Sequence, residues 1–202
     1  MAVNPKAWIS NYFKKKKPFT IVTDIIFIVL IILLLIPGTR KEVASMLIRL
    51  TSLPPSTLNT DEQFTISKNT ADWQLFNKEA QPVRFKQLNG KPVFLNFWAT
   101  WCPPCLAELP GIMNIYEKYK DDVNFVFVSS ENPEVVRKFL VKNGYQESPF
   151  YYAGSVPKDF FSNSIPTTFI ISRKGRVIVS KKGAARWNTD KTEDVLKQLI
   201  KK

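Results

Sequence analysis

The sequence predicts an α/β domain, with a central mixed β-sheet flanked by helices, preceded by one N-terminal transmembrane helix. Three observations predict this arrangement. Residues 19–36 are almost all Ile, Leu, Val or Phe. Apolar runs of strand length alternate with helical patterns from residue 61 onward, and the only two cysteines, Cys102 and Cys105, follow one of these runs. Strands that alternate with helices are typical of a sheet covered by helices.

Composition allows one ordinary domain plus a smaller element, since the chain has 202 residues of which 45% are apolar. The absence of histidine (His 0) excludes His-assisted base catalysis, mixed Cys/His zinc sites and covalent haem attachment. Two cysteines cannot fill a four-coordinate zinc site, so we predict no metal. The formal charge of +12 comes from basic residues spread along the chain without a nucleic-acid-binding motif, so we predict no nucleic-acid partner.

The N-terminal segment predicts a membrane anchor. Residues 1–18 would form a cytoplasmic N-terminus that includes four consecutive lysines, 14–17, and residues 19–36 would span about 27 Å as a helix, close to the thickness of a bilayer core. A cleaved signal peptide is the alternative, but its apolar core is usually shorter, and residues 36–40 offer no small-x-small cleavage site. We therefore expect an uncleaved signal anchor, in which residues 19–36 hold the protein in the membrane. The lysine block predicts a cytoplasmic N-terminus and an extracytoplasmic domain, periplasmic in a bacterium, on a single-pass protein of the cytoplasmic (inner) membrane.

Residues 37–60 predict a juxtamembrane amphipathic helix and a linker. Val43, Met46, Leu47 and Leu50 recur at helical spacing on one face. This helix would lie on the membrane or pack on the folded domain. Two prolines at 54 and 55 then favour a stiff linker.

Residues 61–202 predict the folded domain. Its expected strands are 64–66, 73–76, 82–85, 93–98, 123–128, 150–152 and 177–179, and residues 164–171 are expected to run from a loop into a further strand. Four helices are expected. One follows the cysteines, one occupies 133–143, a short one occupies 156–161, and the last, capped by Asn188 or Thr189, lies near the end of the chain. The run 93–98 is apolar except for Asn96, as expected of a strand buried on both faces of a sheet.

The spacing of Cys102 and Cys105 allows three kinds of chemistry. Two thiols at i and i+3 can close a small structural disulfide, bind a soft metal, or alternate between dithiol and disulfide as a redox catalyst. We favour the redox catalyst, because so short a loop would restrain the unfolded chain little.

The motif FWATWCPPC at 97–105, followed by IPTTF at 165–169, resembles the thioredoxin superfamily, and the chain is similar to its membrane-anchored TlpA/ResA-type thiol-disulfide oxidoreductases. The resemblance covers residues 61–202 and implies a thioredoxin fold with an additional helix-strand insertion between 128 and 166. It also implies Asn96 where thioredoxin has an aspartate, Glu108 as a functional carboxylate, and protein disulfides as substrates, with cytochrome c maturation among the possible processes. No cofactor is expected beyond the Cys102-Cys105 disulfide itself.

The position of the cysteines predicts their roles. Cys102 directly precedes a helix, whose N-terminus favours a thiolate, so Cys102 is the expected nucleophile; Cys105, one turn further and more buried, is the expected resolving cysteine. Pro103 and Pro104 have no N–H to offer the Cys102 sulfur, so we expect a reducing potential. Glu108 is expected to exchange the Cys105 proton with a raised pKa, although helical spacing alone would also permit a solvent-facing carboxylate.

The expected substrate-binding residues are Trp101, Ile165, Pro166 and Thr167. The resemblance implies a cis peptide bond before Pro166, beside the cysteine pair, where the backbone would pair with an extended substrate segment. A reductase in an oxidising compartment also needs recharging, so we expect a membrane-embedded electron donor. Two other functions stay open at this point: a non-catalytic thiol-binding module or Cu(I) carrier, and a disulfide-forming oxidant.

Overall fold

The computed structural model describes residues 17–88 and 90–201, and the predicted cytoplasmic segment therefore lies almost entirely outside the described residues. Two compact units are present, divided between Ala44 and Ser45. The second unit thus includes residues 45–60, which the sequence assigns to a juxtamembrane helix and linker.

The N-terminal unit contains helix α2 (Pro18–Leu35), which begins with a proline at a position that needs no N–H donor. Many of its large apolar side chains are exposed, from Phe19 to Leu35. In the part of the chain that the structure describes, no helix meets both the length and the hydropathy of a membrane span. The membrane anchor stays a prediction. Helix α3 (Pro37–Thr51) follows, and its last two turns belong to the second unit.

A mixed seven-stranded sheet forms the centre of the second unit, in the order β2-β1-β5-β4-β3-β6-β7. The strands are β1 (Gln74–Phe76), β2 (Pro82–Arg84), β3 (Val93–Phe97), β4 (Asn124–Ser129), β5 (Phe150–Tyr152), β6 (Thr167–Ile171) and β7 (Val177–Lys182). β3, β4 and β5 are parallel neighbours, whereas β6, β7, β1 and β2 join antiparallel. The predicted strand 64–66 is wrong: Thr65 makes only an isolated bridge with Arg176.

The helices of this unit are α4 (Lys68–Ala71), α5 (Pro103–Tyr119), α6 (Pro133–Asn143) and α7 (Asp190–Lys201), with short 3-10 helices η1 (Phe85–Leu88) and η2 (Lys158–Phe160). The short helix expected at 156–161 is therefore a single 3-10 turn. The bounds of α6 match the prediction because both ends of the helix are capped. The Asn132 side chain accepts from the Glu134 N–H at the start, and Gly144 at the end adopts a φ of 73°, which favours glycine. Thr189, rather than Asn188, accepts the Thr192 N–H at the start of α7.

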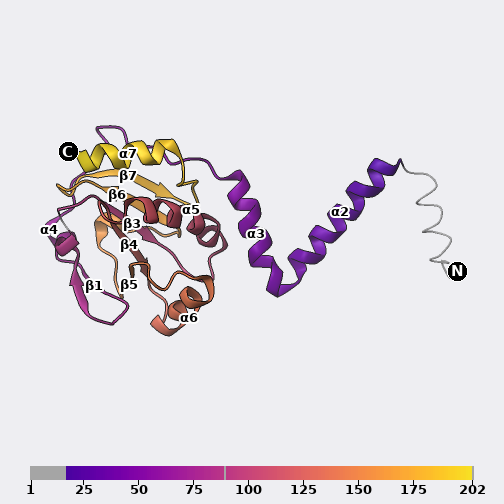
Figure 1. Ribbon diagram of the computed structural model, residues 1–202, viewed down its shortest axis with the longest axis horizontal. Helices are drawn as coiled ribbons and strands as arrows, with labels where there is room; N and C mark the ends of the chain where they lie inside the picture. The colour runs from indigo at the N-terminus through magenta and orange to yellow at the C-terminus, as the bar shows by residue number, and fades with distance from the viewer. Residues whose placement is uncertain (1–16, 89, 202) are drawn as a thin grey trace. The chain divides into compact units, whose positions relative to one another are not determined.

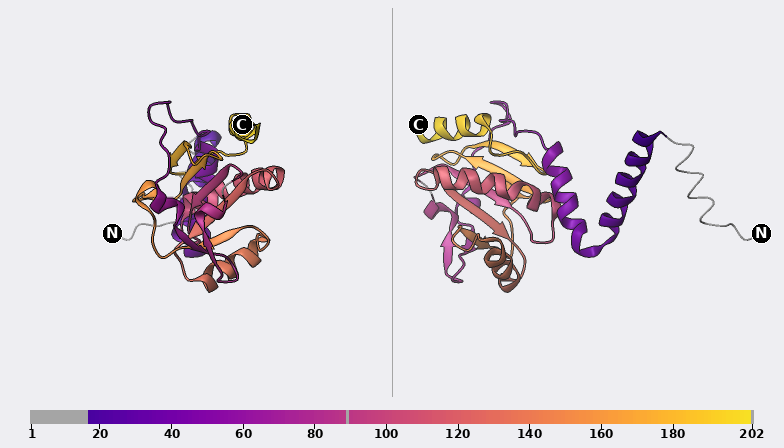
Figure 2. Two further views of the ribbon diagram at one scale, coloured as in Figure 1. Left: turned by 90° about the vertical axis from the view of Figure 1, so that its left-hand side faces the viewer. Right: turned by 45° about the vertical axis from the view of Figure 1, so that its right-hand side comes forward.

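The three long helices α5, α6 and α7 pack on one face of the sheet, with α5 between the other two (Figure 1). Both crossovers, β3-α5-β4 and β4-α6-β5, step in the same direction along the sheet, so right-handed connections put both helices on one side. The opposite face is covered by the short elements, through Trp73, Phe85 and Phe160. The views in Figure 2 show the same layering.

The helix-strand insertion expected between 128 and 166 corresponds to α6 and β5, and β5 extends the sheet beyond β4. At the other side, β3 lies between β4 and β6 and is buried along its whole length. Its side chains alternate between the two faces. Phe94 and Asn96 therefore point toward the long helices, and Asn96 is placed beneath α5.

Candidate active site

The cysteine pair lies where the central strand β3 gives way to helix α5. Cys102 is the N-cap residue of α5, and the prolines at 103 and 104 occupy its first two positions. Proline suits these positions because the first N–H groups of a helix have no intrahelical partner and the ring presets φ. Cys102 and Cys105 form a disulfide with their Cα atoms 5.3 Å apart.

Two backbone groups contact the Cys102 sulfur. The N–H of Cys105 donates to Cys102 Sγ at 3.2 Å, and the carbonyl oxygen of Ile165 lies 3.8 Å from the same sulfur. The first of these contacts is a donor that would stabilise a thiolate, as a capping side chain is stabilised at a helix N-terminus. Because Pro103 and Pro104 supply no N–H, Cys105 provides the first backbone donor of the helix.

Both cysteines are buried, Cys102 at 3% and Cys105 at 2% exposure. Cys105 is the more buried of the two, as expected, but the difference is small. Trp101, directly before Cys102, is instead 58% exposed.

Glu108 is buried on the sheet-facing side of α5, with 4% of its surface exposed, which excludes the solvent-facing alternative. Its Oε1 accepts from Asn96 Nδ2 at 2.9 Å, and its Oε2 accepts from Trp187 Nε1 at 2.9 Å and from the Ala185 N–H at 3.0 Å. Burial raises the pKa of Glu108 to about 7; the donors Trp187, Ala185 and Asn96 and the charge of Lys181 oppose the rise.

A carboxyl group with this pKa is populated in both protonation states near neutral pH. It can therefore both accept and return a proton. Glu108 is six residues after Cys102, so this carboxyl group belongs to the same helix as the cysteine pair.

Asn96 joins this carboxyl to the sheet. Its Nδ2 donates to Glu108 Oε1 and also to Thr168 Oγ1 at 2.7 Å, on the neighbouring strand β6. Both amide hydrogens are thereby used, and Asn96 is only 1% exposed. An amide at this point holds Glu108 without adding a second negative charge.

The residues predicted to bind substrate lie in different environments. The peptide bond between Ile165 and Pro166 is cis, Ile165 is half-buried beside the disulfide, and the Pro166 carbonyl accepts from the Gly183 N–H. Thr167 is fully buried, and its hydroxyl donates to the Ser164 carbonyl at 2.7 Å. Its part in substrate binding stays a prediction.

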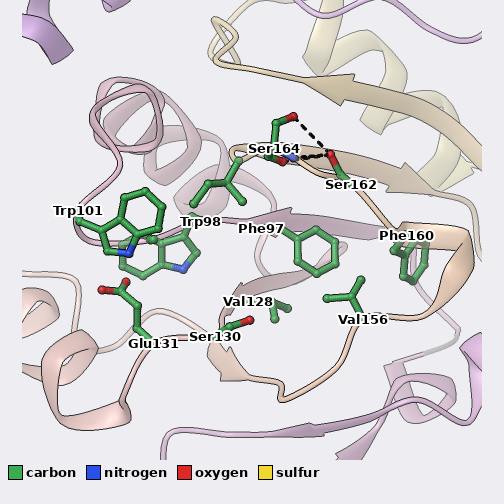
Figure 3. Close-up of a pocket in the computed structure, with 12 residues that line it drawn as sticks. Phe97, Trp98, Trp101, Val128, Ser130, Glu131, Val156, Phe160, Ser162 and Ser164 are labelled. Atoms are coloured by element: carbon green, nitrogen blue, oxygen red, sulfur yellow. Dashed lines mark hydrogen bonds between the residues drawn. The ribbon is translucent and has the colours of Figure 1, made fainter.

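A pocket of about 340 Å³ adjoins this region. Figure 3 shows Trp101 and Glu131 at one end and Val156 and Phe160 at the other. Trp98 also lines it, and the buried Trp98 Nε1 has no hydrogen-bond partner within the described residues. The pocket is mainly apolar, as expected of a surface that receives a side chain or an extended segment.

Trp187 and Ala185 are site residues that sequence reasoning missed. They lie between β7 and α7, far from the cysteines in the sequence, and no local spacing connects them to Glu108. The sequence offered one general indication for Trp187: a buried tryptophan usually needs a hydrogen-bond partner for its indole N–H. Glu131 was also missed; it accepts from the N–H of Thr100 at 2.6 Å and from its hydroxyl at 2.8 Å, thereby tying down the loop before the cysteines.

Within residues 17–88 and 90–201, no group of three or more His, Cys, Asp or Glu side chains is arranged to hold a metal ion. The predictions of no metal and no further cofactor remain predictions.

Known proteins resemble both the sequence and the fold. The family model described as Redoxin matches residues 60–199. The chain is 30% identical over 145 residues to "Thiol-disulfide oxidoreductase ResA" of Bacillus thuringiensis subsp. konkukian, covering 70% of this chain and 80% of the relative. It is 31% identical over 120 residues to the ResA of Bacillus subtilis, covering 58% and 67%.

Among solved structures, a putative thiol:disulfide interchange protein DsbE from Chlorobium tepidum matches with a TM-score of 0.57 and 26% identity, over 65% of this chain and 94% of that one. StoA from Bacillus subtilis matches with a TM-score of 0.50 and 26% identity, over 62% and 93%. The paired cysteines at the start of α5 and these similarities both indicate thiol-disulfide exchange. The chain therefore belongs to the Redoxin family of the thioredoxin superfamily and is a ResA-like thiol-disulfide oxidoreductase.

Proposed function

We propose that this oxidoreductase is a membrane-tethered reductase of disulfides in extracytoplasmic proteins, acting through Cys102 and Cys105. The contact that carries the proposal is the hydrogen bond from the Cys105 N–H to Cys102 Sγ at the start of α5. It gives Cys102, and not Cys105, the environment of a helix N-terminus. Cys102 is therefore the nucleophile, and Cys105 resolves the intermediate.

The reaction begins from the dithiol. The Cys102 thiolate attacks one sulfur of a substrate disulfide; an S–S bond to the substrate forms, and the other substrate sulfur leaves as a thiolate that takes up a proton. Cys105 then loses its proton and attacks the Cys102 sulfur. The second substrate thiol is released, the substrate is reduced by two electrons, and the protein is oxidised to the disulfide.

Glu108 is the proton acceptor in the second step. Its pKa of about 7 lets it take the Cys105 proton and return one when the disulfide is reduced again. Asn96 acts through Glu108 and is a positioning residue, since its hydrogen bond orients the carboxyl group.

The two prolines favour reduction over disulfide formation. A strong oxidant stabilises its reduced form, chiefly through the thiolate. Here the first two helix positions are Pro103 and Pro104, so the Cys102 sulfur receives one N–H from the start of the helix, that of Cys105. The reduced form is correspondingly less favoured than in an oxidant.

Substrate would lie along the exposed Trp101 and the backbone near Ile165 and Pro166, with Thr167 supporting this loop. Ile165 is half-buried and its carbonyl faces the Cys102 sulfur, so an extended segment paired there would bring its own disulfide to that sulfur. The pocket beside Trp101 would receive an apolar side chain of the same segment.

The tether would be residues 19–36, in the single-pass orientation predicted from the lysine block, which puts the domain in the periplasmic or extracytoplasmic space. The exposed apolar side chains of α2 support a lipid environment for this segment. A membrane-embedded donor would supply two electrons and two protons per cycle. Proteins awaiting cytochrome c maturation are one substrate class that the resemblance implies.

Trapping tests the proposal. In Cys105→Ser the resolving sulfur is missing, so mixed disulfides with substrates should accumulate on Cys102 in the full-length protein expressed in a bacterial membrane. Cys102→Ser is the matched control and should trap no partner. The reduced wild type should also reduce insulin disulfides catalytically. Stoichiometric Cu(I) binding without insulin reduction would identify a carrier and contradict the reductase.

A further inference from the structure

The last part of α3 and the residues after it, 45–53, are bonded directly to the redox centre; we refer to them as the docked segment. Ser45 Oγ donates to the carbonyl oxygen of Pro103 at 3.0 Å, and Arg49 Nε donates to that of Ala107 at 3.2 Å. Ser45 is 8% exposed. These contacts join residues 58 positions apart in the sequence.

Both acceptors lie in the opening turns of α5. Pro103 is between the two cysteines, and its carbonyl belongs to the peptide bond that leads to Pro104. Ala107 lies one turn further along the same helix. The docked segment thus adds side-chain donors to two backbone carbonyls of α5, one before and one after Cys105.

The docked segment also bonds to Arg186, in the loop that donates hydrogen bonds to Glu108. The backbone N–H of Arg186 donates to the Leu53 carbonyl at 3.0 Å, and its Nη2 donates to the Ser52 carbonyl at 3.0 Å. Arg186 stands between the two residues that donate to Glu108, Ala185 and Trp187.

Between these two sets of contacts lies a pocket of about 170 Å³. Arg49 and Ser52 line it from the docked segment, and Glu108 and Trp187 line it from the domain. One short segment therefore contacts both the cysteine-bearing turn and the residues around its proton partner.

We infer that the docked segment is a positioning element of the redox centre: Ser45 and Arg49 hold the first turn of α5 in the orientation in which the Cys105 N–H meets the Cys102 sulfur. This orientation favours the Cys102 thiolate. The inference rests on the proposed role of Cys102 as the nucleophile.

Other charged groups surround the same region and stay in place in the test variants. They are Glu108 on α5, Glu131 between β4 and α6, and Lys181 on β7, whose charge acts on Glu108. Since none of these is changed, a shift in the reactivity of Cys102 reports the docked segment.

The test measures alkylation of Cys102 by iodoacetamide in the reduced full-length protein between pH 5 and 9. In Ser45→Ala and Arg49→Met, the rate constant at pH 7 should fall about threefold, and the midpoint of the pH profile should move about half a pH unit upward. Ser45→Thr keeps the hydroxyl and should retain the wild-type profile. Thr51→Ala is the matched control, because the Thr51 hydroxyl donates to the Leu47 and Ile48 carbonyls of its own helix and to no other group among the described residues.

A second measurement is hydrogen exchange at the Cys105 amide, which should become faster in Ser45→Ala and Arg49→Met but not in Thr51→Ala. The inference is overturned if the first two variants match Thr51→Ala in both measurements, or if Ser45→Thr loses as much reactivity as Ser45→Ala. Insulin reduction by the wild type is read separately. A wild type without turnover contradicts the proposed reductase, while the alkylation profiles still decide the role of the docked segment.

Discussion

Asn96 Nδ2 and Glu108 Oε1 form a 2.9 Å hydrogen bond between the central strand and the cysteine-bearing helix, and both residues are buried. The bond gives the carboxyl group a neutral partner. Burial dominates, and the pKa of Glu108 rises to about 7 although the hydrogen bonds from Trp187, Ala185 and Asn96 and the charge of Lys181 lower it.

The first prediction concerns the rate of disulfide exchange. Glu108→Gln removes the proton acceptor while keeping the size of the side chain, so the rate of insulin reduction should fall roughly 100-fold, the lower end of what general acid–base catalysis contributes. Its pH dependence should flatten near pH 7. Glu117→Gln, an exposed position on the same helix that pairs with Lys120, is the control and should keep the wild-type rate. Equal rates in all three proteins would show that Glu108 exchanges no proton in the limiting step.

The second prediction concerns stability against pH. The pKa of Glu108 is raised from 4.5 to about 7 in the folded state, so between these values the folded protein holds a proton that the unfolded chain releases. The stabilisation is fully present below the unfolded pKa and is lost as pH rises through the folded one. Relative to Glu108→Gln, the wild type should lose about 3 kcal/mol of unfolding free energy between pH 4.5 and 7.5. Urea denaturation at both pH values measures this, and a pH-independent difference would contradict the raised pKa.

The third prediction concerns Asn96→Asp. It places a second carboxyl group within hydrogen-bond distance of Glu108, and two buried carboxylates cannot both ionise at low cost. The variant should lose about 3 kcal/mol or more of unfolding free energy at pH 8, and clearly less at pH 5, where the pair shares a proton. Asn124→Asp, on the adjacent strand with a carbonyl partner, provides a comparison that should lack this pH dependence.

The fourth prediction concerns the redox potential. With few N–H donors on the Cys102 sulfur, the midpoint potential should lie below about −180 mV, the range of isomerases and oxidants. Pro104→Ala restores an N–H at the second helix position, which can donate to a capping side chain, and should raise the potential by about 30 mV or more. Pro103→Ala restores one at the first position, which does not serve this purpose, and should change the potential less. A wild-type potential well above −180 mV would identify an oxidant.

Much of the architecture could be predicted because its signals are local. The apolar run before the cysteines predicts a buried central strand, and the helix at 133–143 is delimited by Asn132 and Gly144, each of which acts within one turn of the chain. The strand expected at 64–66 is the counterexample. The Phe64 carbonyl accepts from the Val177 N–H and the Ile66 N–H donates to the Gly175 carbonyl, but these two bonds make a single bridge pair, Thr65 with Arg176, and the pairing does not extend into a strand.

The residues that favour redox chemistry are visible in the sequence: two cysteines stand three positions apart before a helix, with prolines between them and no histidine in the chain. They favour thiol-disulfide exchange over a Cu(I) carrier without excluding the carrier. Only the tertiary structure decided what surrounds that pair. Ser45, Ala185 and Trp187 reach the centre from elements distant in the chain, and no periodicity or spacing encodes such contacts. They exist because residues 45–53 and the loop before α7 pack against α5 within one compact unit, where each buried polar group needs a partner.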